Sequence, residues 1–219
     1  LRVSYKVHRA LQSKFISPKD FPPHPALRSL WRAQDNCAYW HGVFGGLYLP
    51  HLRHAIYENL IKAEALFDQK NHQEKEWVEL ERLDFNGDGD EELILKNPEM
   101  VLLFSSRGGS LLEMDDRSKA FNILESLTRR KEGYHQKLFE AREQVLRSEV
   151  SKARTKTIHE IFHAKEEGLD QSLFFDGYRK ASFLDHFIAE PMDFETFRRG
   201  EYEEEGNFIE EPYAPSFPE

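Results

Sequence analysis

The chain has 219 residues, of which 39% are hydrophobic and 32% charged, as expected for a soluble protein with one large or two small domains. No apolar stretch approaches the roughly 20 residues of a membrane-spanning helix, so we expect no transmembrane segment and no membrane partner. The net charge of −9 is concentrated in residues 190–219, where ten acidic residues face two arginines. The rest of the chain is nearly neutral, which argues against a nucleic-acid partner.

The start of the chain indicates a piece of a longer polypeptide. Residues 1–15 have helical spacing, but no capping residue precedes Leu1, so we expect that the chain begins inside a helix. A single cysteine, Cys37, excludes an intrachain disulfide and is typical of a reducing compartment. We therefore expect a cytoplasmic location.

Helices are predicted for most of the first 70 residues. Four prolines interrupt residues 17–27, and a second helical piece follows at about 27–34. From His51 to Phe67, apolar residues recur every three or four positions behind Pro50, which predicts an amphipathic helix. Residues 68–76 are polar and are predicted to form a linker.

Beyond this linker the hydrophobic period changes to that of strands. Short apolar or alternating runs are separated by the turn sequences NGDGD, NP and RGG, and lie at residues 77–85, 91–97, 100–106 and 110–116. This pattern predicts an antiparallel sheet with hairpin connections. Helical patterning returns at 136–166, and the acidic tail is predicted to be a solvated arm or an edge segment.

These elements predict an α+β protein. A short N-terminal helical region (1–70) is followed by a mainly antiparallel β-sandwich domain with helical excursions (76–219).

The turn DFNGDGDEE carries oxygen-bearing side chains at alternate positions, namely Asp84, Asn86, Asp88, Asp90 and Glu92. Calcium takes six to eight oxygen ligands in flexible geometry, so this spacing predicts a possible Ca²⁺ site. The run matches the first half of an EF-hand loop but has Leu95 where that loop carries its last acid. The alternative is an ordinary acidic hairpin turn, because Asn-Gly and Asp-Gly are common hairpin residues.

Two further patterns could carry chemistry. His159, Glu160 and His163 form an H-E-x-x-H sequence, which on a helix could bind zinc beside a glutamate base, but the sequence offers no recognisable third ligand. Arg129 and Arg130 could bind an anion or pin two domains together by bidentate ion pairs. No phosphate-binding loop accompanies them, so structural pinning is the favoured interpretation.

The segment AQDNCAYWHGVFGGLYLPHLR, residues 33–53, concentrates aromatic and polar side chains before the helix predicted from His51. Tyr39, Trp40 and His41 offer flat apolar faces with polar edges, which suit sugar rings. The alternative is a buried aromatic cluster at a helix entrance.

The same segment resembles the last conserved motif of glycoside hydrolase family 57, in its branch of 4-alpha-glucanotransferases and alpha-amylases. The resemblance continues in order through LDFNGDGDEELIL, SLLEMD, FNILESLTRRKEGYH and FFDGYRKASFLDHFI, and covers nearly the whole chain. The later segments resemble that branch's C-terminal β-rich domain.

The resemblance implies a retaining mechanism, in which one carboxylate attacks the anomeric carbon and a second acts as acid and base. The family carries these groups on an incomplete barrel upstream of the part that this chain resembles. We therefore expect the present chain to lack catalytic residues and to act with a missing N-terminal barrel of the same polypeptide.

The resemblance also implies that Asn36, Tyr39, Trp40 and His41 bind an alpha-glucan or maltooligosaccharide. The family commonly has cysteine at the position of Asp35, so this residue departs from the pattern.

The expected function is thus the C-terminal portion of an alpha-glucan-active hydrolase or 4-alpha-glucanotransferase, in which this chain lines and supports the substrate cleft. One alternative is a calcium-stabilised carbohydrate-binding β-sandwich without catalysis. A remote alternative is a zinc peptidase that uses His159, Glu160 and His163.

Overall fold

The computed structural model describes residues 24–41, 44–136, 173–214 and 216, and the chain divides into two compact units. The first unit comprises residues 1–127 with 181–187 and 205–219, and the second comprises 128–180 with 188–204. The helix predicted at 1–15 and nearly all of the helical pattern predicted at 136–166 lie outside the described residues.

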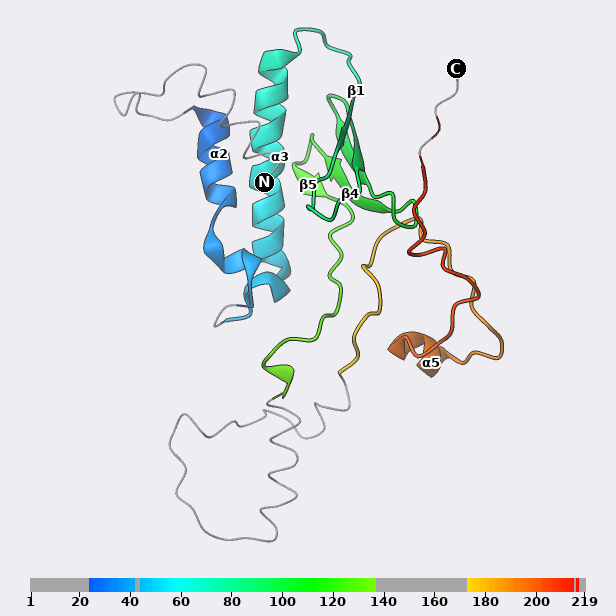
Figure 1. Cartoon of the computed structure of the whole chain (residues 1–219). Coiled ribbons are helices and arrows are strands. Elements are labelled where there is room, and N and C mark those ends of the chain that lie inside the picture. Colours follow the sequence, from blue (N-terminus) through cyan, green and yellow to red (C-terminus); the bar gives the residue numbers. More distant parts are fainter. Residues whose placement is uncertain (1–23, 42–43, 137–172, 215, 217–219) are drawn as a thin grey trace, which may run out of the picture. The chain divides into compact units, whose positions relative to one another are not determined.

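Two helices of the first unit pack against each other (Figure 1). They are α2 (Pro25–Ala33) and α3 (Pro50–Asn71), and each has a proline in its first turn, where no backbone donor is needed. Their shared core is formed by Ala26, Leu27, Leu30 and Ala63, with Leu60, Leu66 and Phe67 packed around it. Both predicted helices are confirmed.

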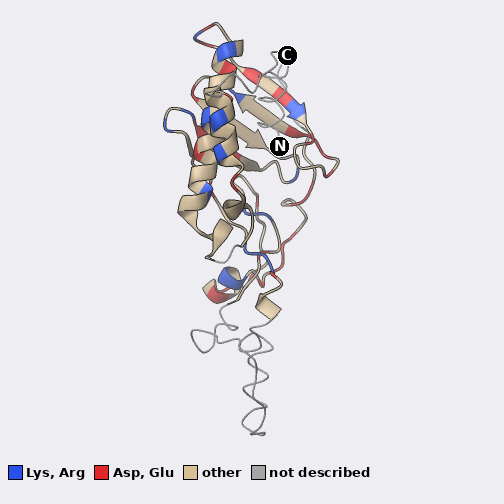
Figure 2. Ribbon diagram, turned by 90° about the vertical axis from the view of Figure 1, so that its left-hand side faces the viewer, with Lys and Arg blue, Asp and Glu red and all other residues tan. Residues whose placement is uncertain are grey.

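Helix α3 is one turn longer than the sequence predicts. It continues to Asn71 because Asp68, which the sequence places in a polar linker, is buried against cations of the sheet. Lys and Arg residues are spaced along this helix (Figure 2). In the part of the chain that the structure describes, no helix is long and apolar enough to cross a membrane.

Five antiparallel strands form one sheet in the order β1-β2-β3-β4-β5. Their bounds are β1 (Glu79–Leu83), β2 (Glu92–Lys96), β3 (Met100–Phe104), β4 (Leu111–Asp116) and β5 (Phe121–Asn122). The four predicted strands and the α+β class are confirmed. Among the described residues the five strands belong to this one sheet, and α3 contacts it at β5, where the rings of His54 and Phe121 are 4.7 Å apart.

The sheet buries one face around Ile94, Val101, Leu103 and Leu112. The alternation expected for a half-buried strand also buries the two ends of β2, Glu92 and Lys96. These charged side chains need partners inside the fold, and their partners define two of the candidate sites.

The acidic tail is partly ordered by the turn between β3 and β4. Pro212 forms an antiparallel bridge with Arg107, and the N–H of Tyr213 donates to the carbonyl of Ser106 at 2.8 Å. This pairing is an isolated bridge outside the five strands, and Pro212 and Tyr213 remain exposed.

In the second unit, a short helix α5 (Phe194–Arg199) forms where the sequence predicts none. Asp193 caps it by accepting a hydrogen bond from the N–H of Thr196 at 2.8 Å, and Gly200, at φ 71°, ends it.

Candidate functional site

Two single turns of 3-10 helix, η1 (Asn36–Tyr39) and η2 (Gly46–Tyr48), connect α2 to α3. Asp35 caps the first of them, because its carboxylate accepts a hydrogen bond from the N–H of Cys37 at 3.0 Å. The residue that departs from the family pattern thus has a local structural role. Cys37 is an exposed free thiol.

Tyr39 and Trp40 keep about half of their surface exposed, with exposed fractions of 57% and 51%. The hydroxyl of Tyr39 donates to the carbonyl of Ala33, at the end of α2, over 2.6 Å. Partial burial of this hydroxyl raises the pKa of Tyr39, so the group stays protonated at neutral pH. One edge of the ring is thereby fixed while most of the side chain stays accessible.

The backbone around Trp40 is held by a tight loop closure. The N–H of Leu47 donates to the carbonyl of Trp40 at 2.9 Å. Gly46 lies so close that a Cβ added to it would stand 2.0 Å from the carbonyl oxygen of Trp40, at a φ of 48° that favours glycine. The ring of His41 meets that of Tyr48 edge-on, with centroids 5.7 Å apart.

The four residues predicted to bind sugar therefore all lie within one short segment, residues 36–41. Asn36, Tyr39 and Trp40 are exposed, and His41 is half-buried against η2. We call Asn36, Tyr39, Trp40 and His41 the η1 surface. In the described chain its aromatic rings are not buried in either hydrophobic core.

The acidic turn between β1 and β2 is held together by its own hydrogen bonds. Asp84 Oδ1 accepts from the N–H groups of Gly87 at 2.6 Å and Asp88 at 3.1 Å, and Oδ2 accepts from Gly89 at 3.0 Å. Both glycines have positive φ, 80° and 94°, which the turn requires.

Glu92 closes this turn from the buried side. Its carboxylate accepts from the N–H of Phe85 at 2.7 Å and from the side-chain amide of Asn86 at 3.0 Å, while burial raises its pKa. On the exposed side, Arg107 Nε donates to Asp90 Oδ2 at 3.1 Å. All five predicted calcium ligands thus lie in or beside one turn, and calcium there stays a prediction.

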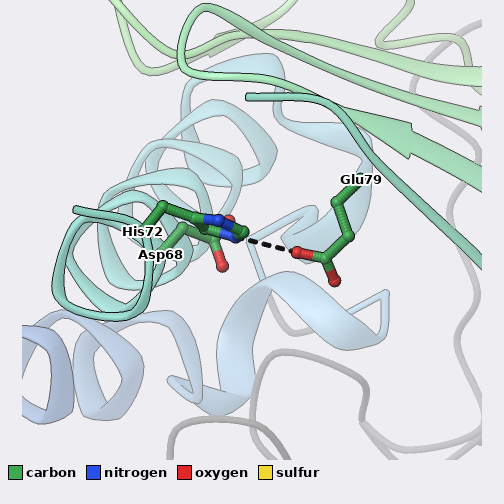
Figure 3. A group of neighbouring side chains, drawn as sticks. All are labelled: Asp68, His72 and Glu79. Carbon is green, nitrogen blue, oxygen red and sulfur yellow. Dashed lines mark hydrogen bonds and ion pairs between the residues drawn. The ribbon is translucent and has the colours of Figure 1, made fainter. Parts of the chain in front are cut away.

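A different group of side chains has ligand atoms that converge to within 4.8 Å of one another. It consists of Asp68, His72 and Glu79, and Figure 3 shows His72 facing Glu79, with Nε2 and Oε2 2.9 Å apart. Asp68 is buried, whereas the other two are half-buried.

Cations of the protein itself already neutralise these carboxylates. Lys96 Nζ lies 3.1 Å from both Asp68 Oδ1 and Glu79 Oε2, and Arg117 Nη2 lies 2.5 Å from Asp68 Oδ2. The ring of Trp77 stacks on the ring of His72, with centroids 3.9 Å apart, and also lies beside the cations of Lys96 and Arg117. A metal would have to displace Lys96, so we interpret this cluster as an ion network that joins α3 to the sheet.

The remaining predicted patterns have different outcomes. Arg129 contacts Asp176 Oδ1 through Nε at 3.0 Å and Nη2 at 2.5 Å, a bidentate ion pair that joins two segments within the second unit rather than two domains. His159, Glu160 and His163 lie outside the described residues, and the zinc hypothesis stays a prediction.

Sequence reasoning missed the partners that hold the η1 surface in place. Arg53 donates to the carbonyl of Leu47 at 2.6 Å and forms an ion pair with Glu125 at 2.8 Å. The only signal for Arg53 was its position in a predicted helix, and nothing in the sequence connects it with Glu125.

Comparison with known proteins gives consistent results along the chain. Residues 1–67 match the middle domain, and residues 84–217 the C-terminal domain, of alpha-amylase/4-alpha-glucanotransferase. Alpha-amylase 1 of Dictyoglomus thermophilum is 46% identical over 178 residues, which are 80% of this chain and 24% of that protein.

A second relative connects sequence with structure. The 4-alpha-glucanotransferase of Thermococcus litoralis is 34% identical over 189 residues, covering 86% of this chain and 27% of that protein. A crystal structure of 4-alpha-glucanotransferase from that organism superposes with a TM-score of 0.69 at 30% identity, over 97% of this chain and 28% of that one. The chain spans about a quarter of the length of these curated relatives. It belongs to the alpha-amylase/4-alpha-glucanotransferase family, glycoside hydrolase family 57, and corresponds to that family's middle and C-terminal domains.

Proposed function

We propose that this chain is part of an enzyme that acts on alpha-glucans, and that the η1 surface contacts the glucan. The observation that carries this proposal is the half-exposed pair Tyr39 and Trp40, fixed beside polar groups at the entrance of α3. The faces of sugar rings pack on aromatic side chains, while their hydroxyl groups need hydrogen-bond partners. Asn36 and His41 supply polar groups next to the aromatic rings.

The ring of Tyr39 and the backbone of Trp40 are held before the substrate arrives, which affects the free energy of binding. Tyr39 is tied through its hydroxyl to Ala33, and the backbone of Trp40 is tied to Leu47. Because the Tyr39 ring and the Trp40 backbone need no further ordering in the binding step, more of the contact energy is available for affinity.

The chemistry itself is proposed to reside on a barrel outside this chain. A retaining mechanism needs two carboxylates about 5–5.5 Å apart on either side of the scissile bond. The η1 surface would hold a glucose unit in the correct orientation relative to those groups. Hydrolysis follows when water is the acceptor, and transfer follows when a second glucan is the acceptor. We accordingly expect that the present chain alone turns over no glucan.

A chimera tests this proposal. The region of the Dictyoglomus thermophilum alpha-amylase that matches this chain would be replaced by this chain, and kcat/KM would be measured on maltooligosaccharides. We expect an active chimera in which Trp40→Ala lowers kcat/KM by roughly tenfold or more, equivalent to about 1.4 kcal/mol. Trp31→Ala is the matched control, since Trp31 is 52% exposed on α2 and outside the η1 surface. An active chimera whose kcat/KM is unchanged by Trp40→Ala contradicts the proposal.

A second candidate is a carbohydrate-binding module that calcium stabilises, which the acidic turn at Asp84–Glu92 favours. It predicts that the isolated chain binds maltooligosaccharides, that Trp40→Ala leaves this binding unchanged, and that a chelator weakens it. The two candidates therefore make opposite predictions for the same Trp40 variant.

A further inference from the structure

Arg53 links the segment that carries Trp40 to the segment that follows β5. It lies near the start of α3, where its Nη1 donates to the carbonyl of Leu47 at 2.6 Å. Its Nε lies 2.8 Å from Oε1 of Glu125, which follows β5 in the chain. The two side chains are only 17% and 15% exposed, so water competes weakly for this pair.

Leu47 transmits this link to the η1 surface. Its carbonyl accepts from Arg53, while its N–H donates to the carbonyl of Trp40 at 2.9 Å. The next residue, Tyr48, contacts the ring of His41. Gly46, on the other side of Leu47, packs directly against the backbone of Trp40 and His41. A displacement of Leu47 therefore displaces Trp40 and His41.

We propose that Arg53 and Glu125 are positioning residues for the η1 surface, an inference that rests on the proposed function of that surface. The guanidinium donates a hydrogen bond to Leu47 through Nη1 and forms an ion pair with Glu125 through Nε, two contacts on different atoms that a single lysine ammonium does not reproduce. Glu125 holds the guanidinium in the orientation that reaches Leu47. The segment after β5 thereby sets the position of a sugar-contacting tryptophan.

The test uses the whole 219-residue chain and two measurements. The first is the NMR signal of each tryptophan indole N–H, of which the chain has three, and the second is the affinity for maltoheptaose. We expect Glu125→Gln and Arg53→Lys to shift the Trp40 signal and to weaken binding at least about fivefold, equivalent to about 1 kcal/mol. The Trp77 signal should stay in place, because Trp77 packs in the separate ion network at the other end of α3.

Glu58→Gln is the matched control. It breaks the ion pair with Lys62 on the same helix, whose side chains are 38% and 49% exposed, and should leave the Trp40 signal and the affinity unchanged. If Arg53→Lys does not fold, Glu125→Gln, which keeps the shape of the side chain, decides alone.

The outcomes separate the positioning role from the function of the surface. A Trp40 signal that stays in place in Glu125→Gln and in every folded Arg53→Lys sample refutes the positioning role, even if Trp40→Ala abolishes binding. If the chain binds no maltoheptaose but the Trp40 signal shifts in Glu125→Gln, sugar binding by this chain is refuted. The positioning of Trp40 by Arg53 and Glu125 is then supported.

Discussion

Replacing Lys96 by methionine removes the ammonium group that lies between Asp68 and Glu79 while keeping a similar side-chain length. Lys96 and Asp68 have side chains only 1% and 2% exposed, so water does not replace the lost partner. Removing one partner of a buried ion pair typically costs ~3–5 kcal/mol. Asp68 retains Arg117, and Glu79 is 32% exposed, so we expect the lower end of this range, about 3 kcal/mol.

Asp68→Asn should cost more than Lys96→Met, because it removes the carboxylate that two buried cations, Lys96 and Arg117, share. Lys96 then keeps only its contacts with more exposed carboxylates such as Glu79. We expect about 5 kcal/mol for this variant, and a double variant that costs less than the sum of the two. Burial opposes the charge on Lys96, but the attraction of Asp68 and Glu64 outweighs it and raises the pKa of Lys96. Lys96 therefore stays charged at neutral pH.

Urea unfolding followed by far-UV circular dichroism measures these differences in the free energy of unfolding. Lys62→Met is the control, since it breaks an exposed pair on the same helix and should cost about 0.3–0.5 kcal/mol. If Lys96→Met costs no more than Lys62→Met, the network does not stabilise the contact between α3 and the sheet, and the reasoning is wrong.

Three other measurements follow from the structure. A chelator should lower the Tm if the acidic turn holds calcium, and Asp88→Ala should abolish the difference; a chelator-insensitive melt would make the turn an ordinary hairpin braced by Arg107. Burial opposes the charge of Glu79, but its hydrogen bonds, chiefly with Glu81 and Lys96, lower its pKa to about 2, so its stabilising effect is complete above about pH 5 and is lost as the pH falls towards 2. Glu79→Gln should therefore flatten the dependence of Tm on pH in that range, and an unchanged slope would assign the acid sensitivity to other groups. Gly46→Ala should destabilise the fold by about 2 kcal/mol or more, whereas Gly87→Ala, with a φ of 80° but nothing within 4 Å of its Cβ, should cost about 1 kcal/mol; equal losses in urea unfolding would contradict the close contact at Trp40.

Periodicity explains why most elements of the described fold could be predicted. The strands β1 to β4 alternate in burial or form short apolar runs between the turn sequences NGDGD, NP and RGG, and the apolar residues of α2 and α3 recur every three or four positions. β5 has only two residues and α5 only six, too few for a period to appear. For α5 the readable signals were the cap at Asp193 and the stop at Gly200, which stand inside a strongly acidic segment.

The site was predictable only where its residues are neighbours in sequence. Tyr39, Trp40 and His41 form one consecutive run, so composition and resemblance were enough to name them. The pair of Arg53 with Glu125 depends on how α3 packs beside β5, and no pattern of single residues encodes that packing. For the same reason, Asp68 looked like a solvated linker residue although Lys96 and Arg117 bury it.

The ion network between α3 and the sheet also bears on how this part of the family can be divided. The matches to the middle and C-terminal domains end at residue 67 and begin at residue 84, which invites a cut between them. A cut after Asp68 would separate this residue of α3 from Lys96 on β2 and from Arg117, which directly follows β4. A cut after Glu79 would also separate Glu79 from Lys96. Each piece would then expose to solvent charged side chains that are buried in the intact fold. We expect such a piece to misfold or to associate with the other piece. Gene fusion and recombination should therefore move helix and sheet together, as a single inherited piece.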